Sequence, residues 1–451
     1  MSIALILISI IFVVGYIAIA TEHSIHVDKA ASALMTGVLV WTVYILASGN
    51  LVDVASLPQW FLEENSLKDV SGLATTWVGH HQLIESLGEI SSILFFLLGA
   101  MTIVELVDTY GGFAIITDRI KSTNTVRLLW IVGLITFFLS AALDNLTTTI
   151  VMISLLRKLV SDKEERLFFA GIVIIAANAG GAWSPIGDVT TTMLWIGGQI
   201  STLSIMKTLI LPSLMTIIVP LAFLSITLRG KRVTAPTTLP VMRRYQVTTK
   251  QRNIIFVLGM LGLLFVPVFK TFTHLPPFMG MLLSLSVLWT VSERMDKDNR
   301  EEVVDAGLHI VTVLKRVDTA SVLFFLGILL AVSALQATGL LASVAIALDQ
   351  TIGNMDVIVF LIGLLSAVVD NVPLVAAAMG MYDLSVFPMD HEMWTFLAYA
   401  AGTGGSVLII GSAAGVAAMG MERINFFWYM KVMSPLALMG YVSGALLYQV
   451  L

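Results

Sequence analysis

The chain has 451 residues, of which 57% are hydrophobic and 12% charged, with a formal net charge of −5. The mean hydropathy is +0.92, and many apolar runs reach the roughly 20 residues that span a bilayer. This composition excludes a soluble globular domain and predicts a polytopic membrane protein. Cysteine is absent, which excludes disulfide and thiolate chemistry.

Ten apolar segments are expected to cross the membrane. Five lie in the first half of the chain, at residues 2–20, 30–48, 89–108, 167–197 and 202–228. Five more lie in the second half, at residues 253–270, 276–292, 319–336, 392–420 and 424–450. The first segment is expected to be a span and not a cleaved signal, because no basic region precedes it.

Two further apolar stretches, residues 126–160 and 356–383, each have an acidic residue at their centre. In the first, Asp144-Asn145 leaves arms of about 15 residues, which is shorter than a full span requires. We therefore expect each stretch to form a re-entrant helical hairpin whose tip stops inside the membrane.

The two halves repeat the same motifs in the same order. The segment Ser140–Asn145 (SAALDN) recurs as Ser366–Asn371 (SAVVDN), and the Asn-Ala-Gly-Gly at 178–181 recurs as Gly-Thr-Gly-Gly at 402–405. Because each half crosses five times, the halves must have opposite orientations, as in many secondary transporters. We expect an all-α fold with a first repeat at 1–229, a basic cytoplasmic linker at 230–252 and a second repeat at 253–451.

The distribution of basic residues supports this topology. If both termini are outside, the inner loops collect all Lys and Arg except Lys68, Lys207 and Lys270, as the positive-inside rule requires. The acidic residues Glu89 and Asp318 occupy equivalent repeat positions near opposite faces. They are candidates for ion entry or coupling, and nearly as good candidates for solvated helix-end acids.

The span at 167–197 contains a helix break. Gly180-Gly181 and Pro185-Ile-Gly187 interrupt it, and irregular backbone at this depth is tolerated only where it lines a cavity. Amide and hydroxyl groups around the break supply neutral oxygen ligands, and Asp144, Asp188 and Asp370 supply charge. Such ligands suit hard cations and protons. Without cysteine, and with His80 and His81 expected in a loop, a soft metal is disfavoured.

Each candidate also has a structural interpretation. Asp144, Asp188 and Asp370 could cap helix N-termini, and Asn145 and Asn371 could shape the hairpin tips. A charge at the membrane centre costs roughly 2.5 to 3.5 kcal/mol, however, which favours a functional role for the aspartates.

These motifs resemble the NhaD-type sodium/proton antiporters of the ion transporter superfamily, most specifically in the segments around Asp144, Asp188 and Asp370. The resemblance implies a bacterial inner-membrane homodimer with a scaffold and a moving transport region, which works by elevator-like alternating access without a cofactor. It implies that Na⁺ and H⁺ bind at Asp144, Asn145, Asn178, Asp188, Thr190, Thr191, Ser366, Asp370, Asn371, Ser406 and Ser412. Gly402 and Ser412 replace Asn178 and Asp188 in the second repeat, so the site should be asymmetric.

The expected function is exchange of cytoplasmic Na⁺ or Li⁺ for external H⁺, which serves pH homeostasis. An aqueous Asp titrates near about 3.9, and burial raises this by up to about three to five units, where protons and sodium compete. We expect Asp144 and Asp370 to be the main carriers, with Asp188 tuning or sharing, and with Na⁺ held by the three aspartates together with Asn145, Asn178 and Asn371.

Two other functions stay open. A sodium-coupled dicarboxylate-type symporter would share the hairpins, but the aspartates at the tips repel anions. An intramembrane aspartyl protease also needs two membrane carboxylates, but its Gly-x-Gly-Asp motif is absent from the sequence. A P-loop is also absent, which excludes ATP-driven pumping by such a loop. We expect no enzymatic activity and no nucleic-acid partner.

Overall fold

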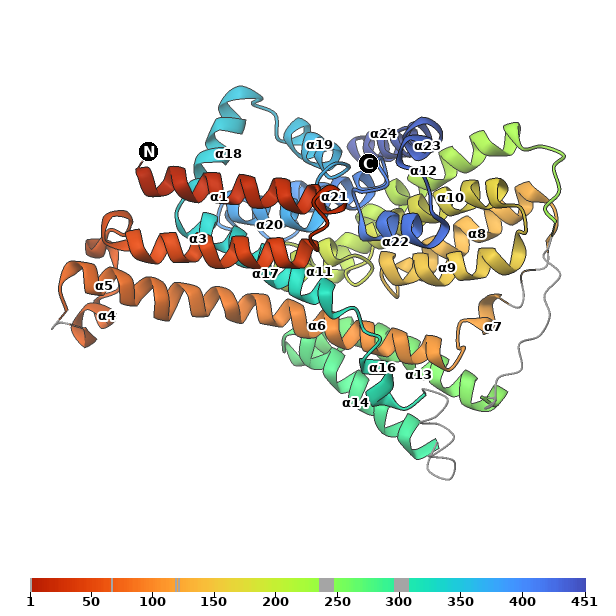
Figure 1. Cartoon of the computed structure of the whole chain (residues 1–451), viewed down its shortest axis with the longest axis horizontal. Helices are drawn as coiled ribbons and strands as arrows, with labels where there is room; N and C mark the ends of the chain where they lie inside the picture. The colour runs from red at the N-terminus through yellow and green to blue at the C-terminus, as the bar shows by residue number, and fades with distance from the viewer. Residues whose placement is uncertain (1, 66–67, 118–119, 121, 235–246, 296–307) are drawn as a thin grey trace. The chain divides into compact units, whose positions relative to one another are not determined.

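The computed structural model describes residues 2–65, 68–117, 120, 122–234, 247–295 and 308–451 (Figure 1). These residues form α-helices joined by short turns, with one isolated bridge between Asn124 and Arg232 and no β-strand. The all-helical fold expected from the composition is therefore confirmed. Of the expected linker at 230–252, residues 235–246 lie outside the described part.

The chain forms two compact units, and neither follows the halves of the sequence. The first unit comprises residues 1–94, 318–353 and 376–386. Its helices are α1 (Ile3–Ala20), α2 (Glu22–Ile25), α3 (Lys29–Leu51), α4 (Gln59–Glu64), α5 (Val70–Trp77), the start of α6 (Leu83–Thr109), α17 (Thr319–Ala337), α18 (Leu340–Thr351) and the end of α20 (Asn371–Met381).

The second unit comprises residues 95–317, 354–375 and 387–451. It contains the remainder of α6 and α20, and in addition α7 (Ala114–Thr117), α8 (Thr125–Ser140), α9 (Asn145–Leu159), α10 (Lys163–Ala182), α11 (Val189–Ile196), α12 (Thr202–Thr227), α13 (Thr249–Thr273), α14 (Pro277–Met295), α16 (Ile310–Leu314), α19 (Met355–Leu365), α21 (Glu392–Gly404), α22 (Ala413–Glu422), α23 (Phe426–Val432) and α24 (Ser434–Val450).

Helices lie at all ten expected spans. Among the described residues, seven helices are long and apolar enough to cross a membrane by themselves, and nine if each of two bent helix pairs counts as one span. The expected span at 392–420 is divided between α21 and α22, and neither part is long enough by itself. The chain is therefore a multi-pass membrane protein.

The third span is longer than the sequence predicted. Helix α5 continues through one π turn at Val78–Gln82 into α6, so that 40 residues from Val70 to Thr109 form one element. The expectation that His80 and His81 lie in a loop is therefore wrong. The polar run Gly79–Gln82 suggested a loop, but a π turn accommodates such residues within a helix. Helix α18 was not predicted either.

Close backbone contact holds the first unit together. Helices α3 and α17 cross where Gly37 faces Gly327, and a Cβ on Gly37 would lie 2.6 Å from the Gly327 carbonyl oxygen. Beside this crossing, the Trp41 indole donates a hydrogen bond to the Leu330 carbonyl at 2.9 Å. Small residues let two helices approach closely in a membrane, where packing and not the hydrophobic effect drives helix association.

The core of the second unit is made of α10 and α21. Helix α10 is buried from Phe169 to Ala182, and α21 from Met393 to Gly404. Helices α8 and α9 pack on α10 and on each other (Figure 1), and α19 packs on α21. The two buried helices are the ones that break, so the irregular backbone lies inside protein and away from lipid.

The breaks in α10 and α21 make equivalent contacts. A Cβ on Gly180 would overlap the Phe137 carbonyl, and one on Gly404 would overlap the Gly363 carbonyl. In the same way, the Ser140 hydroxyl donates to the Ala177 carbonyl at 2.6 Å, and the Ser366 hydroxyl donates to the Ala401 carbonyl at 3.1 Å. Helix α8 is thus joined to α10, and α19 to α21, by a close glycine–carbonyl approach and by a serine hydrogen bond.

We expect Gly404→Ala to lower the free energy of unfolding, because the added methyl group meets backbone that cannot rotate away. Overpacking of this kind costs about 1–3 kcal/mol and should lower the midpoint of heat unfolding of the purified protein. Gly420→Ala is the matched control. A methyl group added at Gly420 would point into open space, and alanine stabilises a helix relative to glycine. Equal midpoints for the two variants would contradict the predicted close approach.

Candidate functional site

The break between α10 and α11 brings Asp188 to the start of a half-helix. Asp188 is the N-cap of α11, and its side chain accepts a hydrogen bond from the Thr190 amide at 3.1 Å. The Thr191 hydroxyl donates to the Asp188 carbonyl at 2.9 Å. Only 2% of Asp188 is exposed, so its carboxylate needs partners within the protein.

Two asparagines at the starts of other helices supply these partners. The Asn145 amide nitrogen donates to Asp188 Oδ2 at 2.9 Å, and the Asn371 amide nitrogen donates to the same oxygen at 3.4 Å. Asn145 is the first residue of α9 and Asn371 the first of α20. Asp188 therefore joins the equivalent tips of the two sequence repeats.

Asn178 extends the network into the second broken helix. Its side-chain oxygen Oδ1 accepts a hydrogen bond from the side-chain amide of Asn145 at 3.0 Å. Its amide nitrogen donates to the Ser406 hydroxyl at 3.0 Å and to the Ser412 hydroxyl at 2.8 Å. All of these side chains are at most 4% exposed. We call the connected group the polar cluster; its members are Asn145, Asn178, Asp188, Asn371, Ser406 and Ser412.

Asp144 lies at the edge of the cluster and caps its own helix. Its carboxylate accepts hydrogen bonds from the Thr147 amide at 2.7 Å and from the Thr147 hydroxyl at 2.9 Å. Its φ is 145° and its ψ 167°, a region that non-glycine residues rarely adopt and that costs about 1–3 kcal/mol. Strain of this kind concentrates at functional sites.

Asp370 has the equivalent place on the second hairpin. Its carboxylate accepts a hydrogen bond from the Val372 amide at 3.3 Å. The charges of both Asp144 and Asp370 act on Asp188. Three carboxylates thus share one region, with Asp188 buried and the other two partly exposed.

Of the other predicted residues, Ser366 lies in the second unit with the polar cluster, and Glu89 and Asp318 lie in the first unit. Ser366 joins the second hairpin to α21, since its hydroxyl donates to the Gly363 and Ala401 carbonyls. Glu89 and Asp318 are exposed, belong to the first unit and make no bond to the polar cluster. Asp318 caps α17, where its carboxylate accepts hydrogen bonds from the Ser321 amide and hydroxyl at 3.0 and 2.5 Å.

Two buried hydroxyl groups were not among the predicted site residues. Thr148 and Thr149 follow Asn145 on α9, both are 0% exposed, and neither hydroxyl has a hydrogen-bond partner among the described residues. The run of three threonines after Asp144-Asn145 was the available signal. Both residues lie about one helical turn after Asn145 on α9.

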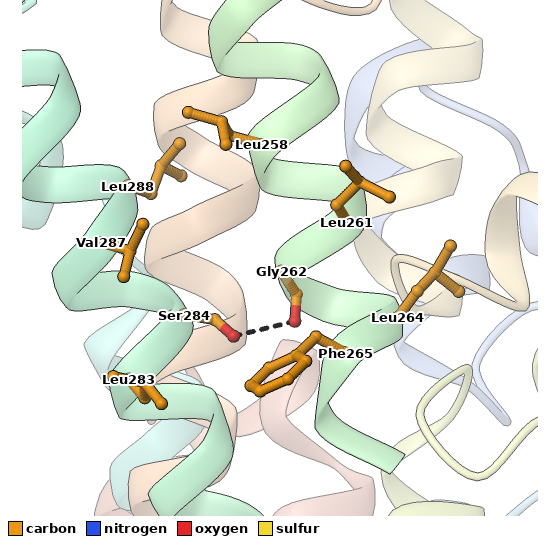
Figure 2. A pocket seen from close by; sticks show the side chains of 9 residues that line it. All are labelled: Leu258, Leu261, Gly262, Leu264, Phe265, Leu283, Ser284, Val287 and Leu288. Atoms are coloured by element: carbon orange, nitrogen blue, oxygen red, sulfur yellow. Dashed lines mark hydrogen bonds between the residues drawn. The ribbon is translucent and has the colours of Figure 1, made fainter. Parts of the chain in front are cut away.

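A separate cavity of about 550 Å³ lies between α13 and α14. Figure 2 shows its lining of leucine, valine and phenylalanine side chains, with one hydrogen bond from the Ser284 hydroxyl to the Gly262 carbonyl at 2.9 Å. It contains none of the predicted site residues and offers no charge to a cation.

The polar cluster offers oxygen ligands of two kinds, one buried carboxylate and several neutral amides and hydroxyls. Within the described ranges, no group of three or more His, Asp or Glu side chains could hold a metal ion. An alkali-metal ion differs from Ca²⁺ in carrying a single charge, so one carboxylate with neutral oxygens is enough to balance it. The arrangement suits a monovalent cation or a proton.

Comparisons with known proteins agree with this chemistry. A family model described as citrate transporter (CitMHS) matches residues 16–397. Sodium/proton antiporter 1 of Arabidopsis thaliana is 47% identical over 442 residues, which cover 98% of this chain and 71% of that protein. The Na(+)/H(+) antiporter NhaD of Alkalimonas amylolytica is 28% identical over 465 residues, which cover 96% and 88%.

One solved structure has a similar fold. The YdaH transporter of Alcanivorax borkumensis superimposes with a TM-score of 0.56 over 92% of this chain and 97% of that chain. The sequence identity is 12%, so the likeness concerns the fold alone.

We expect Asn178→Ala and Ser412→Ala to be non-additive, because both remove the same buried hydrogen bond. Ser412→Ala should cost about 1 kcal/mol, and Asn178→Ala should cost more, because Asn178 makes three buried hydrogen bonds. The double variant should differ from the sum by about 0.5–3 kcal/mol. Heat unfolding of the purified protein measures all three. Asn178→Ala with Ser443→Ala, in α24, is the control pair, for which the effects should add; additivity in both pairs would contradict the cluster.

Proposed function

The chain belongs to the citrate transporter family and, within it, to the NhaD-type sodium/proton antiporters, and on this premise we propose that it exchanges Na⁺ for H⁺ across its membrane. Its relatives are named as transporters and not as enzymes. The observation that carries the proposal is the buried Asp188 carboxylate, which neutral amides and hydroxyls surround.

Competition for one set of oxygens accounts for the exchange. A proton on Asp188 removes the charge that holds Na⁺, and Na⁺ in the cluster stabilises the ionised carboxylate and expels the proton. An empty site would leave a buried, uncompensated charge, which is costly to move through the apolar region. Exchange is obligatory if only the loaded forms cross.

The three aspartates have different roles in this proposal. Asp188 is the central ligand, because it alone is buried and bonded to both hairpin tips. Asp144 and Asp370 flank it as a coupled set and carry protons or Na⁺ between the cluster and water. This ranking differs from the sequence-based expectation, in which Asp144 and Asp370 were the main carriers and Asp188 tuned them.

Alternating access completes the proposal. The six residues of the cluster all belong to the second unit, so the cluster can move as one body in an elevator-like step. The contacts that recur at Gly180 and Gly404 support two repeats of opposite orientation. We place the N- and C-termini outside, Na⁺ export against H⁺ entry, and a homodimer in the inner membrane of a bacterium.

The family description names citrate, which makes a sodium-coupled anion symporter the second candidate. The observation against it is the charge of the site: the charges of Asp144 and Asp370 both act on Asp188, and three carboxylates would repel a carboxylate substrate. The two Arabidopsis thaliana relatives, which are 47% and 45% identical to this chain, are named as sodium/proton antiporters.

Asp188→Asn should abolish exchange, because it removes both the central charge that holds Na⁺ and the carboxylate that takes up the proton. Asp144→Asn and Asp370→Asn should raise the half-saturating Na⁺ concentration about 10- to 100-fold, as loss of an outer partner of an ion site does. Proton movement in inside-out vesicles on addition of sodium, lithium, potassium or choline chloride measures all three.

Asp383→Asn is the matched control for these variants, since Asp383 lies in an exposed turn of the first unit. Activity of Asp188→Asn at the wild-type level would show that the central ligand is wrong. No response of wild-type vesicles to any cation would overturn the antiporter proposal.

We also expect the half-saturating Na⁺ concentration to fall as pH rises. While the site is mainly protonated, one competing proton changes this concentration about tenfold per pH unit and two change it about 100-fold. Initial rates over a grid of pH and Na⁺ concentration give the slope. A maximal rate that changes with pH while the half-saturating concentration stays constant would contradict direct competition.

A further inference from the structure

An ion-pair network around a buried carboxylate lies outside the polar cluster, at the end of α22. Glu422 is the last residue of this helix and its side chain is 2% exposed. The Arg157 Nε donates to one of its carboxylate oxygens at 2.7 Å, and the Arg166 Nε donates to the other at 2.8 Å. We call these three residues the Glu422 clamp.

The two guanidinium groups make further bonds to helix ends. Arg157 also donates to the Met421 carbonyl in the last turn of α22. Arg166 also donates to the carbonyl of Val160, the C-cap of α9, at 2.9 Å. A carboxylate at the negative end of a helix is normally unfavourable; here two cations and these carbonyl bonds compensate it.

The clamp and the polar cluster lie at opposite ends of the same three helices. Helix α9 carries Asn145 at its start and Arg157 near its end, and α22 runs from its N-cap Ser412 to Glu422. Helix α10 runs the other way, from Arg166 near its start to Asn178 near its end. With a rise of about 1.5 Å per residue, the two ends are about 15–18 Å apart on each helix.

The three helices are therefore joined twice. At one end Asn178 bonds both Asn145 and Ser412, and at the other Glu422 bonds both Arg157 and Arg166. A helix held only at the cluster could tilt about that point, which would change the spacing of the ligands. A helix held at both ends cannot do so without breaking a buried ion pair.

We propose that the Glu422 clamp is a positioning device that sets the ligand spacing of the ion site, and so its affinity for Na⁺, without touching the ion. The inference rests on the proposed function. Outer groups that orient ion ligands change affinity by about 10- to 100-fold when they are removed.

The test compares Glu422→Gln with wild type in two measurements. Binding of radioactive sodium to the purified, monodisperse protein should weaken about 10- to 100-fold. In vesicles, the half-saturating Na⁺ concentration should rise by the same factor, while the maximal rate per folded transporter changes less.

A second set of variants covers the case in which Glu422→Gln fails to fold. The Arg157 side chain is 48% exposed, so its substitution leaves the Arg166–Glu422 pair in place. Arg157→Gln should weaken Na⁺ binding, and Arg157→Lys should restore part of the affinity. Lys158→Gln, which removes an exposed charge next to it on α9, is the control and should bind as wild type.

The outcomes separate this inference from the proposed function. Equal sodium binding by wild type, Glu422→Gln and Arg157→Gln overturns the clamp alone. If Glu422→Gln lowers the maximal rate but leaves the half-saturating Na⁺ concentration unchanged, the clamp is also overturned. Glu422 would then serve stability or movement and not Na⁺ affinity. Purified wild type that binds no sodium overturns the proposed function and the clamp's role with it.

Discussion

Unpaired backbone polar groups cannot be left in an apolar membrane interior, and this constraint shapes the second unit. Breaking α10 and α21 frees amides and carbonyls at depth, so both breaks must be enclosed by protein. Glycine makes the enclosure possible, because Gly180 and Gly404 let a neighbouring carbonyl come closer than a side chain would permit. The polar cluster therefore lies inside dense packing around two interrupted helices.

Four of the six residues of the polar cluster lie at helix beginnings. Asn145 and Asn371 are first residues, and Asp188 and Ser412 are N-caps. Helix N-termini carry partial positive charge and by themselves suit anions. This agrees with a family model that is described as citrate transporter. Three aspartates placed at or beside these helix starts reverse the sign of the site. The proposed cation site follows from this reversal. At the helix breaks only the first repeat carries a charge, because Ser412 stands in the second repeat where Asp188 stands in the first.

Sequence reasoning located most of the helices and named all six residues of the polar cluster. Duplicated Asp-Asn motifs and glycine breaks are local signals, and Asn145, Asp188 and Asn371 follow from them. The ranking of the aspartates could not be predicted, because which carboxylate is buried depends on how four separate helices meet. Glu422 carried no local signal at all: an acidic residue before Arg423 reads as a solvated helix end. The 40-residue helix was missed because a π turn tolerates Gly79–Gln82, a run that resembles a loop.

Asp144 has a backbone conformation, with φ at 145°, that glycine adopts without steric strain. Selection of randomly mutated protein for heat tolerance in detergent would therefore reward Asp144→Gly, which relieves the strain while it deletes a carboxylate beside the ion site. Such a variant would purify well and yet report on a different electrostatic state of the site. For this chain, the sequence that is easiest to crystallise is not the sequence whose ion binding should be studied.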